Sequence, residues 1–148
     1  MSETDQNSGL SGLEYLRKLI NDWHGSPMAE TMNMRLVAAD DGTATFEAAP
    51  SPKFYNPQRR LHGGYAATLI DSALGCAVQT KLPAGIGYGT IELKVNYVRK
   101  IDVSDGKLYC TGTVIHAGRT MFTAEARVLG ENGKLYAHGS GTFLVYPK

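Results

Sequence analysis

The sequence predicts an α+β fold in which a curved antiparallel sheet wraps around one long central helix. The first observation is the segment from Gly64 to about Lys81, whose apolar residues occupy nearly every side of a helical wheel. The second is a series of segments in which apolar and polar residues alternate, as in strands with one buried face. The third is their order, which is one helix, two strands, the apolar helix and four more strands.

The N-terminal part of the chain is predicted to add one helix outside this core. Residues 1–9 are polar and are expected to be flexible. Leucines then recur with Ile20 and Trp23 at spacings of three and four residues, which predicts an amphipathic helix from Leu10 to Trp23. Gly25 and Pro27 are expected to end this helix, which can lie on a larger layer.

Two strands are expected before the central helix. Met32–Ala39 and Thr43–Ala49 flank Asp40-Asp41-Gly42, whose residue types favour a tight hairpin turn. Ser51–Leu61 contains two prolines and shows neither a helical nor a strand period. It is therefore predicted to be a loop that leads into Gly63 and Gly64.

Four strands are expected after the central helix. Alternation is clearest in the segment from Ile91 to Val98, where four odd-numbered apolar residues alternate with polar ones. The remaining strands are predicted at Lys107–Ala117, Thr120–Leu129 and Lys134–Tyr146. Turn residues separate them at Ser104-Asp105-Gly106, Ala117-Gly118-Arg119 and Glu131-Asn132-Gly133.

Length and composition limit the classes of function. The 148 residues fit one domain, expected to span residues 10–148. The net charge of +1 is spread over interspersed acids and bases, so neither nucleic acid nor a membrane surface is an expected partner. Cys76 and Cys110 lack the spacing of a metal site or a redox pair, and His24, His116 and His138 lack the spacing of metal ligands. No metal or other cofactor is therefore expected. The absence of a signal sequence and of a membrane-spanning apolar run favours a cytoplasmic protein.

The most informative motif is His62-Gly63-Gly64 at the start of the predicted central helix, followed by Asp71. Glycines leave the backbone N–H groups of a first helical turn uncovered, and these groups favour an anion or a developing oxyanion. Asp71 is a lone carboxylate among apolar residues, where an acid has no evident structural purpose. Together they favour a catalytic site that acts on a carbonyl.

Gly63 and Asp71 cannot serve one site within one chain. Eight residues of helix advance about 12 Å, whereas catalytic contact requires about 3 Å. A two-fold axis that lays two such helices antiparallel would place the Asp71 of one chain beside the Gly63 of the other. If both residues serve one site, the protein is therefore expected to be at least a homodimer.

These features resemble the hotdog-fold acyl-CoA thioesterases, in particular the PaaI-type branch of the 4-hydroxybenzoyl-CoA thioesterase superfamily. The similarity covers about Met28 to Val145. It is carried by Asn56, six residues before His62-Gly63-Gly64, by Asp71, and by Gly89-Thr90 at the entry to a strand. The resemblance implies a hotdog fold and hydrolysis of a small or medium acyl-CoA, with a dimer of dimers common in this branch.

The resemblance also implies roles for individual residues. The Gly63 N–H would bind the thioester oxygen, and His62 and Asn56 would order the loop and the reacting groups. Asp71 of the facing chain would activate water or attack the carbonyl itself, and Thr90 would hold the water. Residues expected to bind coenzyme A are Gly118, Arg119, Thr120, Arg99 and Lys100. Residues expected to suit an aryl or alkyl acyl group, between the two central helices, are Phe54, Tyr55, Tyr65 and Leu74.

Structural explanations stand beside these roles. Asp71 could accept a hydrogen bond from a neighbouring hydroxyl such as that of Thr68, and His62 could simply close the loop. Asn56 before a proline suits an Asx turn, Thr90 is a good strand former, and Arg119 could be a solvated charge in a turn.

Two other functions compete with hydrolysis. A non-catalytic acyl-CoA-binding scaffold would have no use for Asp71. A hotdog-fold dehydratase or hydratase usually carries its own histidine and acid motifs, which are not found here.

Overall fold

The computed structural model describes residues 9–22 and 25–147. Three α-helices, two short 3-10 helices and six strands make up this part of the chain. In chain order they are α2 (Gly12–Asp22), α3 (Pro27–Thr31), β1 (Met34–Asp40), β2 (Thr43–Ala48), η1 (Pro52–Phe54), α4 (Gly63–Gln79), β3 (Ile86–Tyr97), η2 (Val103–Asp105), β4 (Leu108–Ala117), β5 (Met121–Gly130) and β6 (Leu135–Pro147).

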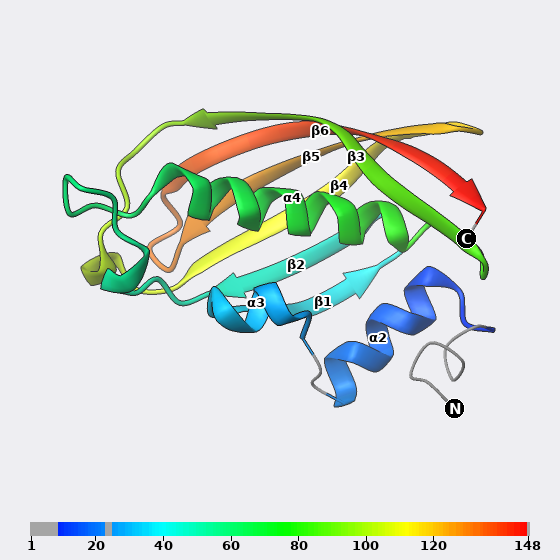
Figure 1. The fold of residues 1–148 in the computed structure, drawn as a ribbon, viewed down its shortest axis with the longest axis horizontal. Helices are drawn as coiled ribbons and strands as arrows, with labels where there is room; N and C mark the ends of the chain where they lie inside the picture. The colour runs from blue at the N-terminus through cyan, green and yellow to red at the C-terminus, as the bar shows by residue number, and fades with distance from the viewer. Residues whose placement is uncertain (1–8, 23–24, 148) are drawn as a thin grey trace.

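The six strands form one antiparallel sheet in the order β1-β2-β4-β5-β6-β3. The sheet curves around α4, with β1 and β3 at its two edges (Figure 1). The predicted architecture, a curved antiparallel sheet around a long helix with an extra N-terminal helix, is confirmed. It is the hotdog arrangement that the resemblance implied.

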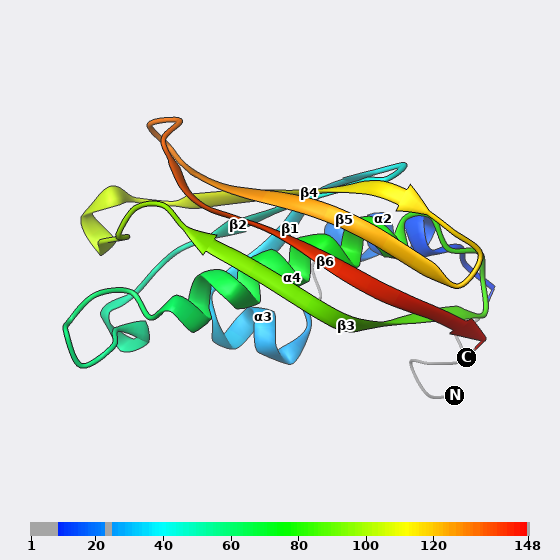
Figure 2. The same cartoon turned by 90° about the horizontal axis from the view of Figure 1, so that it is seen from above.

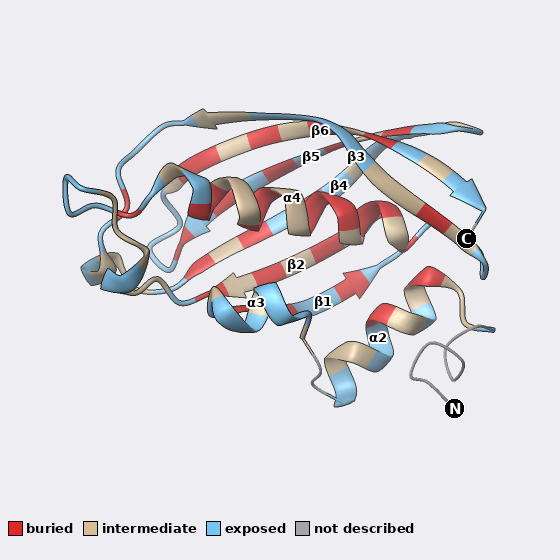
Figure 3. Cartoon of the chain, viewed as in Figure 1, coloured by how far each residue is buried: buried red, intermediate tan, exposed pale blue. Residues whose placement is uncertain are grey.

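Helix α4 has two different sides. One side carries its nine buried residues, which are Tyr65, Ala66, Leu69, Ile70, Ala73, Leu74, Gly75, Ala77 and Val78. Buried segments recur along the helix in Figure 3. The opposite side is a stripe of small and polar residues that are only partly buried, which we call the open stripe: Ala67, Thr68, Asp71, Ser72, Cys76 and Gln79. No other element of the described chain lies in front of α4 in Figure 1. The sequence predicted that α4 would be buried on nearly every side. In the single chain it is fully buried on one side and only partly buried on the other.

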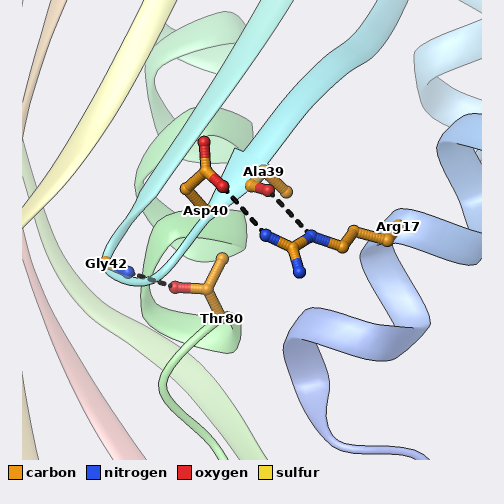
Figure 4. A network of polar contacts seen from close by, with 5 residues as sticks. All are labelled: Arg17, Ala39, Asp40, Gly42 and Thr80. Carbon is orange, nitrogen blue, oxygen red and sulfur yellow. Dashed lines mark hydrogen bonds and ion pairs between the residues drawn. The ribbon is translucent and has the colours of Figure 1, made fainter.

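Helix α2 attaches the N-terminal region to one end of this core. It begins at Gly12 rather than at Leu10, because Ser11 and Glu14 form a capping box: the Ser11 N–H donates to Glu14 Oε2 (2.8 Å), and the Glu14 N–H donates to Ser11 Oγ (3.3 Å). The Arg17 guanidinium then donates to the Asp40 carboxylate (2.8 Å) and to the Ala39 carbonyl (3.3 Å) on β1 (Figure 4).

The end of α4 is tied to the β1–β2 turn by Thr80, a buried polar residue that is 5% exposed. Its hydroxyl accepts from the Gly42 N–H (2.8 Å), as Figure 4 shows, and donates to the Ala77 carbonyl (2.6 Å). Because both partners are fixed backbone groups, this hydroxyl holds the helix in register with the sheet.

Two predicted boundaries differ from the structure for reasons that bear on the fold. Pro27 does not end a helix but starts α3, where the Ser26 hydroxyl caps the Ala29 N–H (3.3 Å), because proline suits the first helical position. Strand β3 begins at Ile86, five residues before the expected Ile91, because its first half pairs with β6 although it lacks regular alternation. The expected flexible residues 1–8, and Trp23, lie outside the described residues.

Candidate active site

The loop before α4 is organised by Asn56. Its side-chain Oδ1 accepts from the N–H groups of Gln58 (3.0 Å) and Arg60 (3.2 Å), and its own N–H donates to the Arg60 carbonyl (2.8 Å). The Asx turn considered for Asn56 is therefore present. After it, the His62 N–H donates to the Phe54 carbonyl (2.9 Å), which fixes the approach of the chain to the helix.

His62 is the N-cap of α4. Its Nδ1 accepts from the Gly64 N–H (2.8 Å), and its carbonyl accepts from the Tyr65 N–H (2.9 Å). An acceptor Nδ1 carries no proton, so the neutral ring has its proton on Nε2. In the described chain no hydrogen bond occupies the Gly63 N–H, which leaves it as the free donor of this first turn.

Both glycines are placed where a neighbouring side chain would have to shift to admit a Cβ atom. A Cβ on Gly63 would lie 3.2 Å from the ring and the hydroxyl of Tyr97, and a Cβ on Gly64 would lie 2.9 Å from His62 Nδ1. The Tyr97 hydroxyl donates to the Gly63 carbonyl (2.7 Å). Tyr97 was not among the candidate residues, because nothing in its strand pattern shows that β3 ends beside the start of α4.

A cavity of about 300 Å³ opens at this end of α4. His62 and Gly63 line it together with Tyr97, Arg99 and Lys100. Arg99 donates to the Leu135 carbonyl (3.2 Å), and Lys100 is exposed. The structure thus places two of the residues predicted to bind coenzyme A in one cavity with the predicted oxyanion donor.

A second cavity, of about 260 Å³, lies on the Gly64 side of His62 and is mainly aromatic. Phe54, Tyr55 and Tyr65 line it, with the rings of Phe54 and Tyr65 5.0 Å apart. Burial raises the pKa of Tyr65 to about 12, and its hydroxyl donates to the Met32 carbonyl (2.8 Å). These three aromatic residues were predicted to suit the acyl group, whereas Leu74, named with them, is fully buried in the core.

Asp71 lies on the open stripe of α4 and accepts a hydrogen bond at Oδ1 from the hydroxyl of Thr90 on β3 (3.0 Å). The alternative partner is wrong: the Thr68 hydroxyl donates to the Gly64 carbonyl (2.8 Å). Thr90 is therefore more than a strand former, because it contacts the predicted catalytic carboxylate directly.

A β-bulge turns Thr90 towards the helix. Thr90 pairs with Phe143 and Glu92 pairs with Thr142, so Ile91 is an extra residue in β3. In a regular strand Thr90 and Glu92 would share one face. With the bulge, Glu92 accepts from the Thr142 hydroxyl (2.8 Å) while Thr90 reaches Asp71 on the side of α4.

Burial keeps the thiol near Asp71 protonated. It raises the pKa of Cys76 to about 12, with a smaller contribution from the negative charge of Asp71. Burial also raises the pKa of Tyr88, and the nearby Cys76 and Asp71 add to this. Since neither group ionises near neutral pH, Asp71 is the charged group available as a base in this cluster.

One described chain does not bring all predicted site residues together. Gly63 and Asp71 are separated by about 12 Å of helix. The turn with Gly118, Arg119 and Thr120, between β4 and β5, lies at the end of the sheet opposite the start of α4 (Figure 2). It is held there by the Val145 N–H, which donates to the Thr120 carbonyl (2.9 Å).

Among the helices of residues 9–22 and 25–147, none combines the length and the apolar composition needed to span a bilayer. The same residues also hold no group of three or more His, Cys, Asp or Glu side chains placed to bind a metal ion.

Comparison with known proteins adds a family. The family model described as "Thioesterase superfamily" matches residues 59–137. A solved structure of a protein from the thioesterase superfamily is 31% identical, with a TM-score of 0.74, covering 91% of this chain and 98% of that one. The E. coli PaaI protein from the phenylacetic acid degradation operon shares the fold, with a TM-score of 0.77 at 18% identity over 89% of this chain and 94% of its own.

A protein of Halobacterium salinarum, named as a "putative esterase", is 41% identical over 71 residues. The match covers 47% of this chain and 45% of that protein, so the chain spans under half of that relative.

Proposed function

Because the chain belongs to the thioesterase superfamily, we propose that it hydrolyses acyl-CoA thioesters to a carboxylic acid and free coenzyme A. The observation that carries this proposal is the free Gly63 N–H at the start of α4, combined with a partly buried Asp71 that Thr90 orients. No cofactor takes part in the proposed reaction.

Each step of the reaction has a group to support it. Asp71 takes a proton from water as the water oxygen attacks the thioester carbonyl. Negative charge then develops on the carbonyl oxygen, where the Gly63 N–H contributes about 3–4 kcal/mol to lowering the barrier. The C–S bond breaks, and the proton that Asp71 took from water passes to the leaving thiolate, which restores the Asp71 carboxylate and releases the carboxylic acid and free coenzyme A. A thiolate is a fair leaving group, so this site needs no strong acid.

His62 and Asn56 take positioning roles in this proposal. His62 occupies the Gly64 N–H and caps the helix, which leaves the Gly63 N–H free, and Asn56 shapes the preceding loop. Thr90 orients Asp71 by its hydrogen bond and lies where it can also contact the attacking water.

The site requires a homodimer. The open stripe of α4 carries Asp71 and is only partly buried in the single chain, and β3 is an edge strand with exposed apolar side chains at Ile91, Leu93 and Tyr97. Covering both surfaces with a second copy, with the two α4 helices antiparallel, supplies the partner subunit's Asp71 to Gly63. Two such dimers are expected to associate further.

The same arrangement completes a binding site for coenzyme A. Arg99 and Lys100 line the cavity beside Gly63, whereas the β4–β5 turn lies at the opposite end of the sheet. When α4 helices run antiparallel, the partner's turn comes to the Gly63 end. Arg119, Gly118 and Thr120 of that turn then bind phosphate oxygens from the other side. The aromatic cavity suits an aryl or arylacetyl group.

Release of free thiol from a panel of aryl, arylacetyl and straight-chain acyl-CoA esters tests this proposal. Asp71→Asn removes the base and keeps the shape, so we expect turnover at least about 100-fold below wild type. Asp41→Asn makes the same change at an exposed turn residue paired with Lys81 and is expected to retain turnover within about twofold.

Three outcomes would contradict the proposal. Near-normal turnover of Asp71→Asn would exclude the assigned base. If the acyl-CoA esters raise the melting temperature of the protein but no thiol is released, the protein is a binding scaffold. An enoyl product without free thiol would identify a dehydratase.

A further inference from the structure

Tyr97 contacts the peptide group between Gly63 and Gly64. Its hydroxyl donates to the Gly63 carbonyl (2.7 Å), and its ring lies against the Gly63 Cα. The N–H of the same peptide group donates to His62 Nδ1 (2.8 Å). One peptide plane is therefore held at both ends, by a strand residue at its carbonyl and by the N-cap at its N–H.

This turn needs such contacts because two successive glycines are conformationally permissive. The direction of the Gly63 N–H depends on the orientation of the backbone around Gly63, and an oxyanion donor is effective only when it is held in position before reaction. His62 belongs to the same loop as the glycines and moves with it. Tyr97 belongs to the sheet, so its hydrogen bond fixes the position of the turn relative to the sheet.

We infer that Tyr97 is a positioning residue, whose hydroxyl fixes the first turn of α4 so that the Gly63 N–H points at the substrate oxygen. The inference rests on the proposed function of Gly63 as oxyanion donor. It also gives a reason for glycine at residue 63: a Cβ atom there would lie 3.2 Å from the Tyr97 ring and hydroxyl, which would have to shift to admit it.

A merely stabilising role would have a different signature. Tyr97 is 57% exposed in the single chain, but β3 is covered in the proposed dimer, so loss of its hydroxyl can remove a contact that stabilises the fold or the dimer. A stabilising role alone would lower the melting temperature and leave kcat unchanged. A positioning role is expected to appear in kcat, because a misplaced donor weakens transition-state binding more than ground-state binding.

The test compares Tyr97→Phe with Tyr146→Phe. Tyr146 is a matched control, since it is 45% exposed and its hydroxyl also donates to a backbone carbonyl, that of Tyr88 (3.0 Å). For Tyr97→Phe we expect kcat to fall about tenfold with KM within about twofold of wild type. Tyr146→Phe should keep both constants within about twofold.

Equal kcat values for wild type and Tyr97→Phe would overturn the inference, as would a change confined to KM.

A double-mutant cycle adds a second criterion. Gly63→Ala places a Cβ against the same ring, so Gly63→Ala with Tyr97→Phe should lose less kcat than the product of the single losses.

A measurement without substrate separates this inference from the proposed function. Amide hydrogen exchange at Gly64 reports the peptide plane directly, and Tyr97→Phe should speed it at least about fivefold while Tyr146→Phe does not. If the wild type releases no thiol from any ester, the proposed function is wrong and exchange alone decides the role of Tyr97. Unchanged exchange in Tyr97→Phe would refute that role whatever the activity.

Discussion

Two inactive variants of this protein should restore activity when they assemble together. Asp71→Asn removes the proposed base. Gly63→Pro removes the proposed oxyanion donor, because proline has no N–H. The backbone at Gly63 accepts proline, since this is the first helical position and His62 before it has φ −61° and ψ 136°, the extended backbone that a residue before proline prefers. The proline Cβ would lie 3.2 Å from the Tyr97 ring, as any Cβ there would.

The expected magnitude follows from the geometry of α4. Gly63 and Asp71 are about 12 Å apart along the helix, so each site takes them from different chains. Each variant alone should retain about 1% of wild-type turnover or less. In a random equal assembly, half the chains supply an intact Gly63 and half an intact Asp71, so about a quarter of the sites are complete.

Co-expression of the two variants from equal promoters, followed by thiol-release kinetics, measures this gain. We expect about 25% of wild-type turnover per chain, at least about tenfold above either variant alone. Gly63→Ala is the control for crowding, because it adds a Cβ beside Tyr97 but keeps the N–H. Co-assembled turnover equal to the mean of the two single variants would refute a site shared between chains.

Three other changes test single contacts. His62→Asn should retain more turnover than His62→Ala, because an asparagine oxygen can cap the helix as Nδ1 does; equal losses in kinetic assays would instead give the imidazole a chemical role. Thr80→Val should lower the free energy of unfolding by about 1–3 kcal/mol in denaturant titrations, since it leaves a buried backbone N–H without an acceptor; an unchanged value would show that another group replaces it. Cys76 and Cys110, whose pKa values burial raises to about 12, should react slowly with Ellman's reagent at pH 8 until denaturant is added, and rapid labelling of the native protein would contradict this. Because the unfolded thiols ionise near pH 9 and the folded ones near 12, their contribution to stability should be complete below pH 9 and be lost as the pH rises towards 12.

The fold was largely predictable because two of its strands, β2 and β5, alternate between buried and less buried residues along their whole length, and β4 and β6 do so over part of theirs. In β5 the buried residues Phe122, Ala124, Ala126 and Val128 recur at every second position, as the sequence shows directly. The start of β3 could not be predicted in this way, because Gly87 and Gly89 interrupt the pattern and the bulge at Ile91 shifts it by one residue. Only pairing with β6 reveals that this segment is a strand.

The candidate site was predictable where the signal is local and not where it is tertiary. An acid on an apolar helix and two glycines at a helix start are visible in the sequence, so Asp71, Gly63 and Gly64 could be singled out. The contact of Thr90 with Asp71 depends on the bulge, and that of Tyr97 with Gly63 depends on where an edge strand ends. Both contacts join α4 to β3. The alternation of residues along β3 does not by itself determine the register of this strand.

The two positions of the motif, 63 and 64, are glycine for different physical reasons. Both were expected to expose their N–H groups, but the Gly64 N–H is occupied by His62, and only the Gly63 N–H is free. Gly64 is small because the His62 ring folds back onto it, and Gly63 is small because Tyr97 packs on it. A serine or alanine at residue 64 would therefore disturb the cap, whereas at residue 63 it would disturb the contact with the sheet. The motif thus leaves one N–H group free and fixes the next peptide group at both ends, an arrangement that suits the preorganised donor of the proposed oxyanion site.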